Sequence, residues 1–135
     1  MKVAALLGVL LVPPVAAQGA LGDAARGAQA AWLAHNPQAL VGQSASVVLQ
    51  IPGADASAPL GRAQAIELLR RYLRTAAERT LAVRNVREVA PGNGFVELER
   101  EYTVLGTKDV RRETLFLRFR FAGTGWDLVE VRTAP

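Results

Sequence analysis

The sequence contains no cysteine and only one histidine, His35, among its 135 residues. The lack of cysteine excludes disulfides, thiolate catalysis and cysteine-ligated zinc or iron–sulfur centres. A single histidine also excludes sites that need several imidazole ligands, although composition leaves a carboxylate site for a hard cation open. The fold must therefore be stable through packing alone, and we expect neither a metal nor another cofactor.

Lysine is scarce as well, because two lysines stand against fourteen arginines in a chain of net charge +4. Such an arginine excess raises the question of nucleic-acid binding, in which guanidinium groups would follow the phosphates. The arginines are interleaved with glutamates, however, as in residues 97–101 and 111–113, and they form no basic stripe. We therefore expect no nucleic-acid partner.

No apolar run is long enough to cross a membrane, since residues 3–12 fall well short of the roughly 20 that a spanning helix needs. This run follows Lys2 and is followed by a proline pair and by small residues, which is the order of a secretory signal peptide. We place cleavage between Ala17 and Gln18. The sequence thus predicts an exported protein, periplasmic or secreted, whose single mature domain spans residues 18–135 without a stable membrane anchor. The alternative is a buried N-terminal strand or helix.

Hydrophobic periodicity predicts mainly helical structure in the first half of the mature chain. Asp23 is a plausible N-cap of the first helix, and Asn36 with Pro37 is expected to end it. A long amphipathic helix over residues 61–79 has apolar residues on one face, with Glu78 among the charged residues of the other. The complete prediction is helices at 23–35, 37–41 and 61–79, a strand at 46–51 and a loop at 54–59.

After Thr80 the apolar residues alternate with polar ones, which is typical of half-buried strands. A change of phase near Arg84 and Asn85 predicts a β-bulge that bends the sheet. The connections are short and rich in glycine, so the strands should form an antiparallel meander. We expect four strands, at 81–89, 95–104, 111–121 and 126–132.

The hairpin between the second and third of these strands has a register that the sequence can test. Pairing Leu105 with Val110 places apolar residues opposite one another on one face and glutamate opposite arginine on the other. In this register Tyr102 lies opposite Glu113, and Arg100 lies diagonal to Glu113. The sequence therefore predicts that these polar residues meet on the otherwise apolar face.

Besides the order of elements, four segments carry a family resemblance: GRAQAIELL at 61–69, ELEREY at 97–102, LFLRFRF at 115–121 and GWDLVEV at 125–131. The chain resembles the nuclear transport factor 2-like superfamily, and within it a group of small exported bacterial proteins of unknown function. The resemblance implies a cone-shaped α+β fold, with a curved antiparallel sheet of four main strands plus a short one, packed against two to three N-terminal helices. It also implies that a pocket can lie between helices and sheet, in folds that host isomerases, dehydratases, polyketide cyclases and non-catalytic subunits.

Arg100, Tyr102 and Glu113 are polar exceptions on the apolar face of the predicted sheet. They could line the mouth of a pocket and orient an anionic or hydroxylated ligand. They could instead form an internal ion pair and hydrogen bond, which we favour because an unpaired buried charge costs several kcal/mol. Trp32 and Tyr72, on the apolar faces of helices, complete the candidate ligand-binding set, although aromatic residues there are more often part of the core.

On the opposite sheet face, Phe116, Val129 and Val131 form an apolar strip that predicts a homodimer through the sheet. The alternative is a bulge in the last strand that turns Val131 inward.

No constellation of catalytic residues stands out in the sequence. We therefore expect a non-enzymatic exported domain that binds a small ligand or an envelope protein. The alternative is a small-molecule lyase or isomerase in which Tyr102, Glu113 or His35 performs acid–base chemistry. For His35, a position at the end of a helix favours capping over catalysis.

Overall fold

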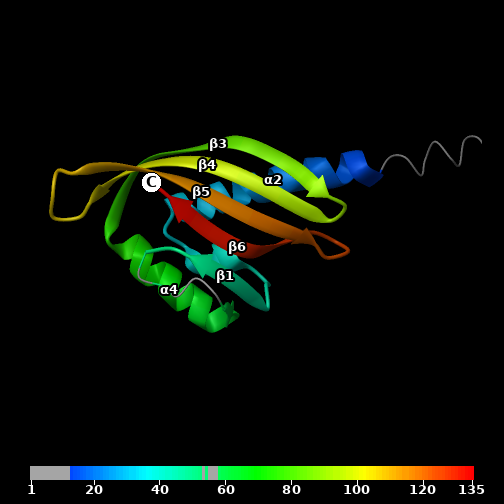
Figure 1. The fold of residues 1–135 in the computed structure, drawn as a ribbon, viewed down its shortest axis with the longest axis horizontal. Coiled ribbons are helices and arrows are strands. Elements are labelled where there is room, and N and C mark those ends of the chain that lie inside the picture. Colours follow the sequence, from blue (N-terminus) through cyan, green and yellow to red (C-terminus); the bar gives the residue numbers. More distant parts are fainter. Residues whose placement is uncertain (1–12, 53, 55–57) are drawn as a thin grey trace, which may run out of the picture.

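The computed structural model describes residues 13–52, 54 and 58–135 (Figure 1). The described residues form three helices and one six-stranded sheet with strand order β2-β1-β6-β5-β4-β3. Neighbouring strands are antiparallel except β1 and β6, which are parallel. The elements are α2 (Pro13–Leu33), α3 (Pro37–Val41), β1 (Ser46–Gln50), β2 (Pro59–Gly61), α4 (Arg62–Arg74), β3 (Ala76–Ala90), β4 (Asn93–Val104), β5 (Val110–Phe121) and β6 (Trp126–Ala134).

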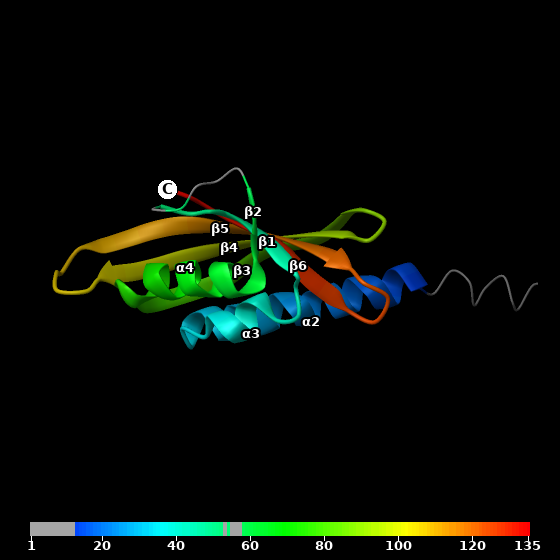
Figure 2. The same ribbon diagram turned by 90° about the horizontal axis from the view of Figure 1, so that it is seen from below.

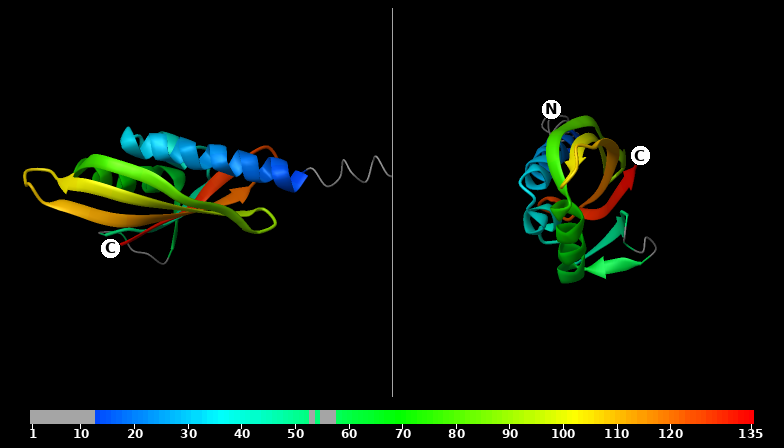
Figure 3. Two further views of the ribbon diagram at one scale, coloured as in Figure 1. Left: turned by 90° about the horizontal axis from the view of Figure 1, so that it is seen from above. Right: turned by 90° about the vertical axis from the view of Figure 1, so that its left-hand side faces the viewer.

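The helices lie on one side of a bent sheet, as Figures 2 and 3 show. Helix α2 runs along β3, and α4 packs against β1. This arrangement confirms the predicted α+β cone, with β2 as an additional short strand at the edge and β1 as a parallel addition to the meander. The register irregularity between Val83 and Asn85 confirms the bulge expected there, and β3 has two further irregularities along its pairing with β4.

Apolar residues at every second position of the strands and on one face of each helix form one core between the helices and the sheet. On α4, Ala65, Ile66, Leu69 and Leu73 are buried at the spacing of a single helix face. Each fully buried side chain of this size contributes roughly 1.5–3 kcal/mol of transfer free energy. The buried residues that the sheet contributes include Val96, Leu98, Leu115, Leu117, Phe119, Leu128 and Val131.

Helix α2 begins earlier than predicted and differs in how it is capped. Asp23 lies inside the helix, where it pairs with Arg26 one turn later, so its assignment as N-cap is wrong. The helix crosses the predicted cleavage site between Ala17 and Gln18, while residues 1–12 of the predicted signal peptide lie outside the described residues. Cleavage and export stay predictions. Leu21 and Trp32, which are buried on α2, belong to the predicted mature chain.

The long predicted helix at 61–79 ends at Arg74, and Ala76 already belongs to β3. Residues 76–79 have good helix propensity, but here their backbone pairs with the far end of β4, where Ala76 lies opposite Val104. Long-range pairing therefore outweighs local propensity in this segment. The consequence for function is that Glu78 occupies a strand and not the exposed face of a helix.

The register predicted for the β4–β5 hairpin is wrong by two residues. Thr103 lies opposite Val110, and Arg100 lies directly opposite Glu113. The reason is that the backbone N–H of Leu105 donates to the carbonyl oxygen of Thr75, at 3.0 Å, instead of pairing within the hairpin. Because a shift of two residues leaves every side chain on its own face, the predicted inner and outer faces are still correct.

A substitution at Gly94 tests how tightly α2 packs against the sheet. A Cβ atom at this position would lie 2.6 Å from Cδ1 of Leu21, which is fully buried, and 3.2 Å from Cζ3 of Trp126. We expect Gly94→Ala to lower the free energy of unfolding by about 1–3 kcal/mol, as overpacking does. Urea unfolding of both proteins measures this. In the control, Gly125→Ala, the new Cβ meets nothing within 4 Å; equal losses in the two variants would contradict the prediction.

Candidate functional site

Arg100 is a charged residue buried in the middle of the structure, with only 1% of its side chain exposed. It projects from the inner face of β4. Its Nε and Nη2 donate hydrogen bonds to the two carboxylate oxygens of Glu78, at 2.7 and 2.6 Å. Its Nη1 donates to Oε1 of Glu113 at 2.9 Å and to the hydroxyl of Tyr72 at 3.1 Å. The guanidinium is thus held by bidentate pairing on one side and by two oxygens on the other.

The two carboxylates have further partners of their own. Glu78 accepts a hydrogen bond from Nε1 of Trp32 at 3.2 Å, and Nε2 of His35 lies 3.3 Å from its other oxygen. Glu113 accepts a hydrogen bond from the hydroxyl of Tyr72 at 2.5 Å. Charges from β3, β4 and β5 are therefore connected to aromatic side chains from α2 and α4, and the Arg100 guanidinium has hydrogen-bond partners at each of its three nitrogens.

Three aromatic rings surround the same guanidinium. Its Cζ atom lies 3.8 Å from the ring centre of Tyr102, 5.1 Å from that of Trp32 and 5.3 Å from that of Tyr72. Such cation–π contacts are strongest where water is excluded. We call this group the Arg100 cluster, and its members are Trp32, Tyr72, Glu78, Arg100, Tyr102 and Glu113.

Three ionisable groups of the cluster, Tyr72, Glu78 and Arg100, are held in their ordinary charge states. Burial opposes ionisation of Glu78, but the hydrogen bonds and charge of Arg100 outweigh it, so the pKa of Glu78 is lowered. Burial likewise opposes the charge of Arg100, yet Glu78 raises the pKa of Arg100 further above its usual range. Burial, followed by the hydrogen bond to Glu113, raises the pKa of Tyr72 far above the usual tyrosine value. These three groups therefore do not titrate near neutral pH.

The structure brings together all of the residues that the sequence suggested for a ligand site, namely Trp32, Tyr72, Arg100, Tyr102 and Glu113. It shows the internal ion pair and hydrogen bonds, whereas ligand contact stays a prediction. Sequence reasoning missed Glu78 as a partner because it placed this residue on a helix. Ala76 and Glu78 stand two residues apart, so they share one face of a strand, and this spacing is the sequence signal that could have placed Glu78 on β3.

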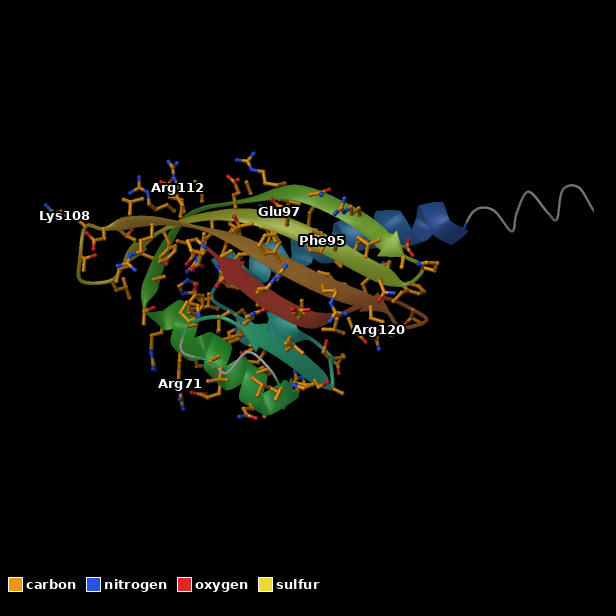
Figure 4. All side chains as sticks on the ribbon, viewed as in Figure 1. Arg71, Phe95, Glu97, Lys108, Arg112 and Arg120 are labelled. Atoms are coloured by element: carbon orange, nitrogen blue, oxygen red, sulfur yellow. The ribbon has the colours of Figure 1, made fainter. Side chains whose placement is uncertain are left out.

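A groove of about 390 Å³ lies beside the cluster, where the α4 C-terminus and the segment after β1 face the tips of β4 and β5. We call it the mouth groove. An adjoining hollow of about 360 Å³ shares Tyr102 and Arg111 with it. In Figure 4, Arg71 on α4 and Lys108 at the hairpin tip mark this end of the molecule. The mouth groove is lined by Ile51, Pro52, Ala54, Leu68, Arg71, Tyr72, Thr75, Tyr102, Val104 and Arg111.

Two other kinds of site were sought among the described residues. Within residues 13–52, 54 and 58–135, no group of three or more histidine, aspartate or glutamate side chains could hold a metal ion. None of the helices in this part of the chain is long and apolar enough to cross a membrane.

On the outer sheet face, the structure differs from the predicted apolar strip at one residue, Val131. Val131 is completely buried, because a register shift after Arg118 places an extra residue in β6. The predicted outward position of Val131 is therefore wrong, and the bulge alternative is right. Phe116 does face outward, with its ring centre 5.9 Å from that of Phe95 and the Arg132 guanidinium 4.7 Å above it.

No family model matches the sequence, and no curated protein matches it. Solved structures do match. A ketosteroid isomerase-like protein from Erwinia carotovora atroseptica superposes with a TM-score of 0.71 at 20% identity, over 87% of this chain and 96% of the other. A candidate dehydratase of the NTF2-like family from Streptomyces avermitilis gives 0.67 at 15% identity, over 90% and 97%. A DUF4783 family protein from Bacteroides ovatus gives 0.63 at 12% identity, over 79% and 90%.

The chain has the nuclear transport factor 2-like fold. The predicted resemblance is thereby confirmed at the level of fold. Sequence identities of 20% or less carry the architecture only, so the activity named for a structural neighbour does not transfer with it. Within this nuclear transport factor 2-like fold, the Arg100 cluster occupies the space between helices and sheet.

Replacing Arg100 by leucine tests how much the cluster contributes to the stability of the fold. The Arg100→Leu variant leaves two largely buried carboxylates, Glu78 and Glu113, without their counter-charge. We expect the free energy of unfolding to fall by about 3–5 kcal/mol, measured by urea denaturation. The matched control is Arg118→Leu, which removes a more exposed pair with Glu130 and should cost at most about 1 kcal/mol. Comparable losses in both variants would contradict the assignment.

Proposed function

We propose that this protein is an exported, non-enzymatic domain that binds a small ligand in the mouth groove. The observation that carries the proposal is the division of the cone into two parts. Its interior is occupied by the Arg100 cluster, in which the guanidinium is satisfied by Glu78, Tyr72 and Glu113. The mouth groove beside it leaves about 390 Å³ open, which lies within the usual range of small-molecule sites.

The charge states within the cluster support binding over catalysis. A general acid or base works best with a pKa near the operating pH, because it must exchange a proton during turnover. The lowered pKa of Glu78 and the raised pKa values of Arg100 and Tyr72 move these groups away from that condition. Buried ion-pair networks of this kind also occur for purely structural reasons.

The alternative function, a lyase or isomerase, would use Tyr102, Glu113 or His35. Glu113 is engaged by Arg100 and Tyr72, and the ring of Tyr102 stacks on the guanidinium. His35 lies 3.3 Å from Glu78 and carries an unusual backbone φ of 51° just after α2. All three candidates are thus tied into the structural network, which favours the binding proposal.

A nuclear magnetic resonance titration of the mature chain tests ligand binding. The probes are octanol, octanoate and octylammonium, which share one apolar tail and differ in charge. Binding of at least one probe should be saturable, and it should shift the backbone amide signals of Tyr102, Val104 and Arg111 more than those around Phe116. Saturable shifts for none of the three would contradict the proposal.

We also propose a homodimer through the outer sheet face. The support is a pair of aromatic residues, Phe95 and Phe116, in a hollow of about 150 Å³ whose other lining residues include Arg118, Glu130 and Arg132. Light scattering should give twice the monomer mass at high micromolar concentration, and Phe116→Glu should give the monomer. The control is Val89→Glu, on the edge strand, where the valine is 54% exposed. A monomeric parent protein would contradict the dimer.

A further inference from the structure

We infer that the ligand of the mouth groove is an amphipathic carboxylate, whose apolar body lies on the groove floor and whose carboxylate meets Arg111 and the hydroxyl of Tyr102. This inference rests on the proposed function and names the ligand class for the same site. It follows from three properties of the groove: its polar end, its apolar floor and the sign of its charge.

The polar end is formed by two directly opposite residues, Tyr102 on β4 and Arg111 on β5. Both stand on the inner face, one step beyond the sealed pair of Arg100 and Glu113. Arg111 forms no ion pair with any residue in the described part of the chain, and within that part the Tyr102 hydroxyl has no hydrogen-bond partner. The groove therefore offers one guanidinium and one phenol that the fold leaves for a ligand.

The neighbouring arginine, Arg112, is engaged differently from Arg111. Arg112 points to the outer face, where its Nε lies 3.4 Å from a carboxylate oxygen of Glu101. Glu101 also pairs with Arg79 at 3.2 Å, so the outer face balances its own charges. Among the described residues that line the mouth groove, none carries a carboxylate that could balance Arg111 in this way.

The floor and walls of the groove are apolar. Leu68 and Tyr72 come from α4, Ile51 follows β1, and Val104 ends β4. Tyrosine rings and aliphatic side chains of this kind cover an alkyl chain or a single aromatic ring. A purely polar anion would leave this surface exposed to water, so an apolar body is part of the expected ligand.

The charge of the lining selects the sign of the ligand. Among the described residues that line the groove, the charged ones are Arg71 and Arg111, and none is a carboxylate. Arg71 is only loosely engaged, since its Nε lies 3.3 Å from Glu67, a residue that Arg70 holds more closely at 2.8 Å. A cationic headgroup would therefore be repelled. One available guanidinium and one hydroxyl suit a singly charged carboxylate better than a phosphate, whose three acceptor oxygens require more donors.

The same three probes test the inference. Octanoate should bind at least tenfold more tightly than octanol or octylammonium, with the largest amide shifts at Tyr102, Val104 and Arg111. Arg111→Gln should weaken octanoate binding about tenfold while leaving octanol binding unchanged, because only the charged headgroup loses its partner. Tyr102→Phe should weaken octanoate binding severalfold. Urea unfolding accompanies each variant to establish that it is folded.

The matched control is Arg120→Gln, which removes an exposed arginine near the other end of the sheet (Figure 4) and should leave octanoate affinity unchanged. Octanol binding as tightly as octanoate in the mouth groove would overturn the carboxylate inference and leave the proposed function standing. An equal loss in the Arg111 and Arg120 variants would reveal general charge attraction and would also overturn it. Binding of none of the probes would overturn both.

Discussion

The fold is organised around one buried positive charge. A guanidinium removed from water needs compensation from charges and hydrogen-bond acceptors, because the desolvation of an ion is expensive. Arg100 on β4 obtains it from Glu78 on β3 and Glu113 on β5, while Tyr72 on α4 supplies a further oxygen. Trp32 at the end of α2 donates to Glu78 and so joins the first helix to the same network. Five elements must therefore assemble correctly before this charge is satisfied.

Filling the cone in this way changes what the fold can offer a ligand. A buried ion-pair network is weak support for stability, because well-packed apolar side chains of the same volume often serve as well. Its effect here is to occupy the interior with Arg100, Glu78 and Tyr72, which do not titrate near neutral pH. The recognition surface that we propose lies further out, at Tyr102 and Arg111, the next pair along the same two strands. The buried pair Arg100–Glu113 and the pair Tyr102–Arg111 at the mouth groove are thus consecutive inward-facing pairs of the β4–β5 hairpin.

Much of this arrangement could be predicted from side-chain periodicity. Arg100, Tyr102 and Glu113 were assigned to the inner face because they share the phase of Leu98 and Leu115, and a register error of two residues preserved that assignment. Glu78 could not be found in the same way. Its segment favours a helix locally, and its strand conformation depends on pairing with residues more than twenty positions away, such as Tyr102.

The sequence by itself determined the alternation of apolar and polar residues, the bulge near Asn85 and the amphipathic α4, because each follows from spacing along a short stretch of chain. Tertiary structure decided where α4 ends, which residues face one another across β4 and β5, and that Val131 turns inward. It also decided that Glu78 is the closest partner of Arg100. These outcomes depend on hydrogen bonds and ion pairs between distant segments, whose free energies compete with local propensity only once the chain has folded.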